Sequence, residues 1–210
     1  DVEQYSELHF LPLFYVDDFT RSRDNDVEEF DGYDLCFIGT AHSDRLFVID
    51  AIEAECKLKG YRFIYYLYSP SKLLFYLSQL YYFFLKRRFA ASKSKVRFKS
   101  LPKHEVANII AKSKIIVDIE HPAQCGLTMR TFEVLASKKK LLTTNHNILD
   151  YSFYSENNIF VFDRLKTLIP EEFVSSKFEC IDECFSRYSL QSWLETIFQP
   201  GELKRTKLKR

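Results

Sequence analysis

Short runs of apolar residues alternate along this chain with longer segments in which apolar positions recur at helical spacing. The runs hold four to eight residues and are bounded by polar loops, as buried strands are. Six strands are predicted, over residues 34–39, 61–68, 96–101, 115–118, 140–143 and 158–162. Five helices are predicted, over residues 43–57, 71–89, 102–111, 128–137 and 189–198. This alternation predicts an α/β fold with a parallel, doubly wound sheet.

The predicted domain covers residues 34–198, with a segment of different character on either side. Residues 1–33 are acidic and irregular, and residues 199–210 form a basic tail. Within the acidic segment, residues 10–15 are apolar and should pack on something. The chain begins with Asp1 rather than methionine, so we expect it to be a piece of a longer protein with a partner domain upstream.

The composition is that of a folded protein in a reducing compartment. Hydrophobic residues make up 46% of the 210, and only 5 Gly and 6 Pro are present, which argues against a disordered chain. The 5 cysteines are odd in number and irregularly spaced, which fits reduced thiols in the cytosol. Cys180 and Cys184 are four apart but lack the second pair that a structural zinc site needs.

Charge is distributed unevenly although the net charge is only +1. Residues 1–34 hold eleven acidic and two basic side chains, whereas residues 72–103 hold nine basic and no acidic ones. The apolar run 73–85 has thirteen residues, fewer than the roughly 20 needed to span a bilayer. Residues 71–100 therefore read as a basic amphipathic insertion. An anionic membrane surface, single-stranded nucleic acid, or a core helix followed by a solvated basic loop would each account for it.

The loops after the predicted strands hold the candidate chemistry, because ligands of such sheets bind beyond the carboxyl ends of the strands. Gly39 permits a tight turn after the first strand, and Ser43 can cap the next helix. Thr40, His42 and Arg45 would then face the crevice, where Arg45 could reach a phosphate or pair with a carboxylate. A plain strand-to-helix loop is the alternative, and the glycines of a dinucleotide fingerprint are missing.

Two acids and a histidine follow the predicted strand 115–118. Asp118 and Glu120 could act as a base or orient sugar hydroxyls, or they could simply cap a neighbouring helix. His121 precedes Pro122, which holds it extended beside Glu120.

The stretch from His121 to Glu133, with the following residues up to Asn145, carries the strongest signal. Gly126 lies where the chain must turn into the predicted helix, and Thr128 can cap that helix. A helix N-terminus beside a glycine is a ready anion site, and a carboxylate one turn further in suits a ribose. Arg130 and Glu133 lie three apart and would form either part of a nucleotide diphosphate site or a plain surface ion pair.

These residues resemble bacterial glycosyltransferases of lipopolysaccharide-core and capsular-polysaccharide synthesis. The resemblance rests on residues 34–45, 124–133, 139–145, 151–154 and 158–159, and it covers about residues 5–198. It implies the C-terminal, donor-binding half of a GT-B enzyme, in which two Rossmann-like domains face each other across a cleft. The implied reaction transfers a sugar from a nucleotide-sugar donor to a growing surface glycan or lipid-linked glycan.

The resemblance also implies roles for individual residues. Glu133 would bind the donor ribose, Arg130 would neutralise the phosphates, and Glu120 and His121 would face the sugar. Gly39, Thr40 and Arg45 would line the phosphate side of the cleft. The remaining donor-binding candidates are Gln124, Gly126, Leu127, Thr128 and Asn145. No cofactor or metal is implied, because GT-B enzymes usually manage the leaving nucleotide without one.

The chain departs from the family pattern in two respects. A second acid often stands eight residues before the ribose-binding one, but that position is Cys125 here, so Glu120 or Gln124 would have to serve. The half that brings the acceptor site and often the catalytic base is absent, so residues 1–33 read as the interdomain linker, with 10–15 packing on the missing domain. The fragment could then bind a nucleotide without turning it over.

The function expected from the sequence is therefore that of a donor-binding glycosyltransferase domain. We expect it in the cytoplasm, peripheral on the inner face of the bacterial inner membrane, with residues 72–99 as the contact to anionic lipid. A non-catalytic, flavodoxin-like binding or interaction domain is the alternative, and a nucleic-acid-binding module is a weaker one. The loops of such domains would hold no nucleotide. The common ATPase, hydrolase and zinc-protease motifs are missing from the sequence.

Overall fold

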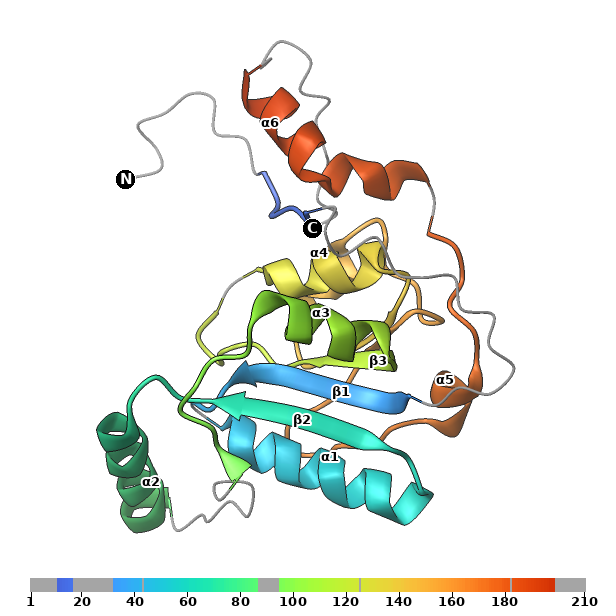
Figure 1. Cartoon of the computed structure of the whole chain (residues 1–210). Coiled ribbons are helices and arrows are strands. Elements are labelled where there is room, and N and C mark those ends of the chain that lie inside the picture. The colour runs from blue at the N-terminus through green and yellow to red at the C-terminus, as the bar shows by residue number, and fades with distance from the viewer. Residues whose placement is uncertain are drawn as a thin grey trace.

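The computed structural model describes residues 11–16, 32–42, 44–86, 95–124, 126–181 and 183–198. A parallel sheet of five strands, in the order β2-β1-β3-β4-β5, forms the centre of this part of the chain (Figure 1). The strands are β1 (Tyr33–Thr40), β2 (Phe63–Tyr68), β3 (Ser113–Asp118), β4 (Lys140–Thr143) and β5 (Ile159–Val161). The predicted α/β fold with a doubly wound parallel sheet is confirmed.

The strand predicted over residues 96–101 is reduced to a single parallel bridge between Tyr68 and Arg97 at the edge of the sheet. After Arg97 the chain bends away, and Phe98 packs edge-on against Phe75 with the ring centroids 5.9 Å apart. Arg97 lies next to β2, on the side away from β1. If the segment at Arg97 is counted as the third strand in sequence, the strand order is the 3-2-1-4-5-6 order of dinucleotide-binding folds. The order reverses between β1 and β3, which makes their carboxyl ends the switch point of the sheet.

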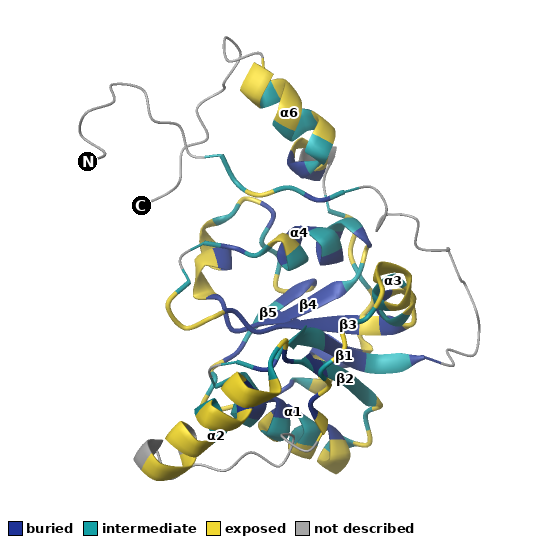
Figure 2. Cartoon of the chain, turned by 60° about the vertical axis from the view of Figure 1, so that its left-hand side comes forward, coloured by how far each residue is buried: buried dark blue, intermediate teal, exposed yellow. Residues whose placement is uncertain are grey.

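Helices cover both faces of the sheet (Figure 2). Successive side chains of a strand point to opposite faces, so a strand that is apolar throughout has two faces to bury. Leu35 and Phe37 of β1 belong to the core beneath α1 (Arg45–Lys59), whereas Cys36 belongs to the core of the other face. That second face is covered by α3 (Lys103–Ala111) and α4 (Met129–Ala136).

In helix α1, the apolar positions of the sequence coincide with the buried side of the helix. Its buried positions include Leu46, Ile49, Ile52 and Cys56, three or four residues apart, so they lie on one side of the helix. The helix ends at Gly60, which has a φ of 72° and donates its N–H to the carbonyl of Cys56. A side chain there would be strained, so glycine fixes the end of the helix.

The C-terminal part folds into short elements that the sequence pattern did not predict. They are the 3-10 helices η4 (His146–Asp150) and η5 (Glu183–Tyr188) and the short helix α5 (Glu171–Ser175). Helix α5 is tied to β4 by the buried Lys140, whose Nζ donates to the carbonyls of Phe173 and Ser176. The helix predicted over 189–198 is α6 (Leu190–Phe198).

The apolar segment near the N-terminus packs on the chain's own C-terminal helix, which corrects the prediction that residues 10–15 pack on a missing domain. Tyr15 forms a parallel bridge with Ser189, and Trp193 Nε1 donates to the carbonyl of Pro12 at 3.0 Å. The rings of Phe14 and Trp193 lie 4.8 Å apart. Phe10 lies outside the described residues.

The helix predicted over 71–89 is described as α2 (Lys72–Lys86), and residues 87–94 lie outside the description. Helix α2 stands away from the sheet in both views (Figures 1 and 2). A search of the described helices finds none with the length and apolar character that crossing a bilayer requires.

Candidate functional site

The candidate site lies at the carboxyl ends of β1 and β3, where the strand order reverses. The loops that leave these two strands, the start of α4 and the loop after β4 meet there. This is where Rossmann-like domains bind their ligands. The sequence prediction that these loops share one edge of the sheet follows from the parallel pairing and is confirmed.

Arg45 holds the loop after β1 against the loop after β3. Its Nε donates to the carbonyl of Ile119 at 2.7 Å, and its Nη1 donates to Thr40 Oγ1 at 2.8 Å. Burial lowers the pKa of the Arg45 guanidinium, an effect that the Asp118 carboxylate opposes. The guanidinium therefore serves as a link between two loops in this structure.

Gly39 does not make the tight turn that was predicted for it. Strand β1 continues through Gly39 to Thr40, and Gly39 pairs with Leu67 of β2. The ring of Phe37 lies over it, so that an added Cβ would come within 2.7 Å of the Phe37 Cζ. Glycine is needed there for close packing. Ser43, the predicted helix cap, lies outside the described residues, and α1 begins after Asp44 without a side-chain cap bond.

Arg164, which the sequence reading missed, forms the centre of an ion-pair cluster at this edge. Its Nη2 donates to both the side chain and the backbone carbonyl of Glu120 at 2.6 Å, and its Nη1 lies 2.8 Å from Asp44 Oδ1. Thr144 Oγ1 donates to the second Glu120 oxygen. Burial opposes the charge on Arg164, but the bonds to Glu120 and Asp44 outweigh it and raise the pKa. The sequence offered one indication of this role: Arg164 follows β5 by three residues, so it lies at the same carboxyl edge of the sheet as the other loops.

Glu120 is consequently only 8% exposed and has charged or hydroxyl partners on both oxygens. The structure places it at the predicted edge. Its carboxylate is occupied by Arg164 and Thr144, so a sugar hydroxyl would have to compete with these partners.

Helix α4 begins as the sequence pattern predicted. Gly126 has a φ of 88°, in the left-handed region that favours glycine, and its carbonyl accepts a hydrogen bond from Asn145 Nδ2 at 2.8 Å. Thr128 is the N-cap residue, with Oγ1 accepting the N–H of Thr131 at 3.3 Å. The loop after β4 thus fixes the turn into α4 through Asn145.

Asp118 faces the first turn of α4 from the end of β3. Its Oδ2 accepts hydrogen bonds from Thr128 Oγ1 at 2.7 Å and from Thr131 Oγ1 at 3.3 Å. Burial raises the pKa of Asp118, and the Thr128 hydrogen bond and Arg45 partly offset this rise. The carboxyl group therefore closes the inner side of the helix N-terminus.

Arg130 and Glu133 lie side by side on α4. Arg130 Nη1 is 3.0 Å from Glu133 Oε2, but this buried nitrogen has no partner with hydrogen-bond geometry within the described ranges. Burial raises the pKa of Glu133, which Arg130 partly offsets. The ion pair that the sequence left open is therefore present, with one donor of Arg130 still unsatisfied. Leu127 is 5% exposed and belongs to the core beneath α4, so it supports the helix start from below.

His121 and Gln124 lie on the rim of the site. His121 is exposed, and its Nδ1 accepts the N–H of Ala123 at 3.1 Å. Gln124 closes the turn by donating its N–H to the carbonyl of His121 at 2.8 Å. The ring of His121 lies 5.3 Å from that of His42, which was predicted to face the crevice. Burial, followed by the nearby charges of Arg45 and His121, lowers the pKa of His42 to about 4.

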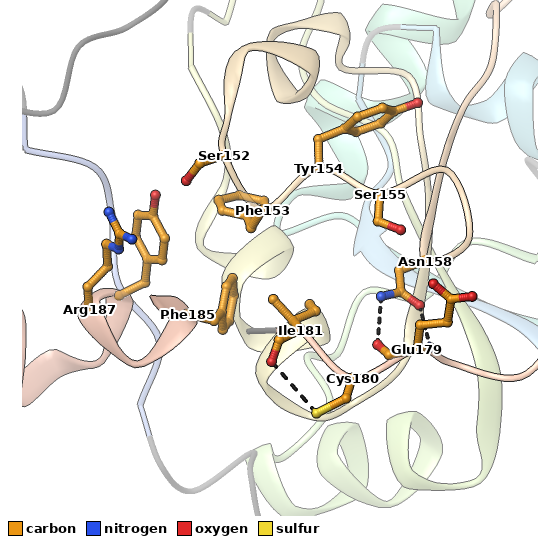
Figure 3. A pocket seen from close by; sticks show the side chains of 11 residues that line it. Ser152, Phe153, Tyr154, Ser155, Asn158, Glu179, Cys180, Ile181, Phe185 and Arg187 are labelled. Atoms are coloured by element: carbon orange, nitrogen blue, oxygen red, sulfur yellow. Dashed lines mark hydrogen bonds between the residues drawn. The ribbon is translucent and has the colours of Figure 1, made fainter. Parts of the chain in front are cut away.

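A cavity of about 310 Å³ lies elsewhere, beside the residue that precedes β5 (Figure 3). Phe153 and Phe185 form its apolar side, and Asn158 exchanges two hydrogen bonds of 2.8 Å with the backbone of Glu179. Because it adjoins the amino end of β5, this cavity is at the opposite end of the strands from the switch point. The described residues contain no group of three or more His, Cys, Asp or Glu side chains that could hold a metal ion.

The fold and the switch-point loops define a Rossmann-like α/β domain with a polar site at the carboxyl edge of its sheet. No known protein-family profile matches the chain, and no curated protein is detectably similar to it in sequence.

Proposed function

We propose that this domain binds the diphosphate and ribose of a nucleotide-sugar donor and forms the donor half of a glycosyltransferase. One observation carries the proposal: α4 opens from Gly126 at the switch point of a Rossmann-like sheet, with Glu133 one turn further in. Thr128 caps the N–H of Thr131, but a first helical turn has further N–H groups that the helix itself does not use, and the helix dipole favours an anion beside them. Glu133 follows about one turn later on the helix, and a carboxylate accepts hydrogen bonds from both hydroxyls of a ribose diol.

Arg130 supports the same assignment. Its buried Nη1 lacks a hydrogen-bond partner among the described residues, although it lies 3.0 Å from Glu133. Unsatisfied buried donors are uncommon in proteins, and a ligand oxygen is one way to satisfy them. In the proposal, Arg130 donates to a phosphate oxygen of the donor and Glu133 accepts from the ribose.

In the proposed reaction, an acceptor hydroxyl oxygen forms a bond to the anomeric carbon of the donor sugar. The bond from that carbon to the diphosphate oxygen breaks, and the nucleoside diphosphate leaves with the electron pair. The proton of the acceptor passes to a base on the acceptor side. The α4 N-terminus and Arg130 would stabilise the negative charge that develops on the diphosphate, which is electrostatic catalysis of leaving-group departure.

Calorimetric titration with the nucleoside diphosphates UDP, GDP and CDP tests the proposal. We expect one of them to bind, and Glu133→Gln to weaken that binding about 10- to 100-fold, since a charged acceptor of ribose hydroxyls contributes about 1.5–3 kcal/mol. Glu105→Gln, on the exposed surface of α3, is the matched control and should bind like the wild type. The proposal is refuted if no nucleotide binds, or if the two variants bind equally well.

A non-catalytic binding domain is the second candidate, and the pairing of the cations favours it. Arg45 is bonded to Thr40 and the carbonyl of Ile119, and Arg164 to Glu120 and Asp44. Arginines that are bonded to groups of the protein itself hold the loops in place and are not free to bind a phosphate. Absence of nucleotide binding in the titration would favour this candidate.

A further inference from the structure

Helix α2 exposes an unusual amount of apolar surface. Eight of its large apolar side chains are between 52% and 70% exposed: Leu73, Leu74, Tyr76, Leu77, Leu80, Tyr81, Phe83 and Phe84. At about 100° per residue they cover an arc of about 180° on the helix surface. Monomeric proteins rarely leave so large a continuous apolar patch uncovered, so this surface indicates a partner.

One aromatic side chain attaches the helix to the domain. Phe75 is 3% exposed and packs on the core beneath α1, and its ring lies 5.9 Å from that of Phe98. The backbone of Arg97 is held to the end of β2 by hydrogen bonds with Leu67 and Ser69. The root of α2 is therefore fixed, while the side chains of its apolar arc are exposed, as the colouring of the helix shows (Figure 2).

The surroundings of α2 are basic. Residues 72–103 contain nine Lys and Arg side chains and no Asp or Glu. Lys72 opens the helix, and Arg97 and Lys99 follow it in the described part of the chain, whereas Lys95 is paired with Glu53 at 2.8 Å. Apolar and Tyr side chains flanked by cations are the composition of helices that lie in the interface of an anionic bilayer.

We propose that α2 is a membrane-binding helix that inserts its apolar arc into the headgroup region of an anionic lipid surface. The length of the helix agrees, because its fifteen residues are too few to cross a bilayer, which takes about 20. Two tyrosines, Tyr76 and Tyr81, lie on the arc and suit the boundary between headgroups and acyl chains.

A second copy of the chain fits this surface less well. Pairing two α2 helices would bring together two segments, residues 72–103 of each copy, that carry nine Lys and Arg and no Asp or Glu of their own. Like charges across an interface are unfavourable, and they become more so as water is excluded. An anionic lipid surface supplies the opposite charge and an apolar layer at the same time, so it matches both features of α2.

The membrane would then lie on a defined side of the domain. Helix α2 begins four residues after the carboxyl end of β2 and extends beyond that edge of the sheet (Figure 1). The switch-point site lies at the same edge. If the proposed function holds, the membrane contact would hold the donor site near acceptors in the lipid surface; the membrane proposal itself does not depend on it.

Vesicle co-sedimentation of the full chain tests the proposal. We expect binding to vesicles of equal parts phosphatidylglycerol and phosphatidylcholine, and at least about tenfold weaker binding to phosphatidylcholine alone, since the cations lose their partners. Leu77→Glu should reduce binding to the anionic vesicles at least about tenfold, because it puts a carboxylate into the inserted arc. Leu58→Glu is the matched control: Leu58 is 84% exposed but lies on α1, and binding should be unchanged.

Fluorescence measures the depth of insertion. The chain has 1 Trp, Trp193 on α6, so the wild type supplies the background for Tyr81→Trp. Brominated lipid should quench the new indole and leave Trp193 unquenched. Equal binding of wild type and Leu77→Glu, or no quenching at position 81, would overturn the proposal. So would a wild type that ignores vesicles but forms a dimer that Leu77→Glu dissociates, because the arc would then be an interface between copies.

Discussion

Replacing Arg164 by methionine is expected to destabilise the domain by about 3 kcal/mol. Arg164 joins three parts of the carboxyl edge: the residue before α1, the end of β3 and the segment after β5. Methionine keeps most of the aliphatic stem but removes all of these bonds. Glu120, a carboxylate that is 8% exposed, would be left with Thr144 as its hydrogen-bond partner in the described structure.

The magnitude follows from the exposure of each partner. Breaking a buried ion pair by removing one member costs about 3–5 kcal/mol, because the other charge is left without compensation. The side chains of Arg164 and Glu120 are 19% and 11% exposed, which puts this pair at the low end of that range. Asp44 is 27% exposed, so its bond adds at most about 0.5 kcal/mol.

Urea unfolding followed by far-ultraviolet circular dichroism measures this loss. Glu120→Gln and the double variant complete a thermodynamic cycle, in which we expect the double variant to lose at least about 1 kcal/mol less than the sum of the single losses. Lys57→Met, which removes an exposed pair with Glu53, is the control and should cost about 0.5 kcal/mol or less. A loss below about 1 kcal/mol for Arg164→Met, or additive losses in the cycle, would refute the reasoning.

Three further predictions concern the same edge of the sheet. Thr128→Ala should destabilise the domain by about 1–2 kcal/mol in urea unfolding, through loss of the N-cap and of a donor to Asp118, whereas Thr128→Ser should keep most of the stability. Asp118→Asn should become more stable relative to the wild type as pH rises above about 4: burial raises the pKa of Asp118 in the folded state, so wild-type stability falls through that window. His42→Gln should lose less stability on acidification between pH 6.5 and about 4, since the folded state keeps His42 neutral to a pKa of about 4 while the unfolded chain takes up the proton. The difference should be about 1 kcal/mol, reduced from the full shift because His42 is partly exposed to solvent.

Each of these has a result that contradicts it. Equal losses for the alanine and serine variants would remove the capping role of Thr128. A stability difference between Asp118→Asn and the wild type that stays constant with pH, in thermal melts over a pH series, would mean that the carboxyl group is not perturbed. Parallel pH curves for His42→Gln and the wild type would exclude His42 as the acid-sensitive group.

Parallel pairing explains why much of the site could be predicted. The loops that hold Thr40, Glu120 and Asn145 were assigned to one edge because parallel strands bring their carboxyl ends together. The start of α4 was also predictable, since a glycine at positive φ and a threonine cap act within a few residues of each other. Such local devices are written in consecutive residues, so the sequence alone shows them.

Pairing between distant residues could not be predicted in the same way. Arg164 is 44 residues from Glu120 and 120 residues from Asp44, and the spacing of charges along the chain does not indicate which acid it meets. Lys140 begins the predicted strand 140–143, but a lysine in the sequence does not indicate what its amino group meets; it is 3% exposed and bonded to the backbone carbonyl of Phe173 in α5. Phe14 and Trp193 meet across the two ends of the chain.

The sequence by itself thus determined the alternation of strands and helices, the two buried faces of the sheet and the glycine-led start of α4. The strands, helices and buried faces follow from the spacing of apolar residues along the chain. The start of α4 follows from a backbone conformation that glycine adopts more easily than other residues. Only the tertiary structure decided that Arg45 and Arg164 are held by internal partners, and that the root of α2 is buried while its apolar arc is exposed. Burial and ion pairing depend on which side chains meet in space, and that is set by the packing of the whole domain.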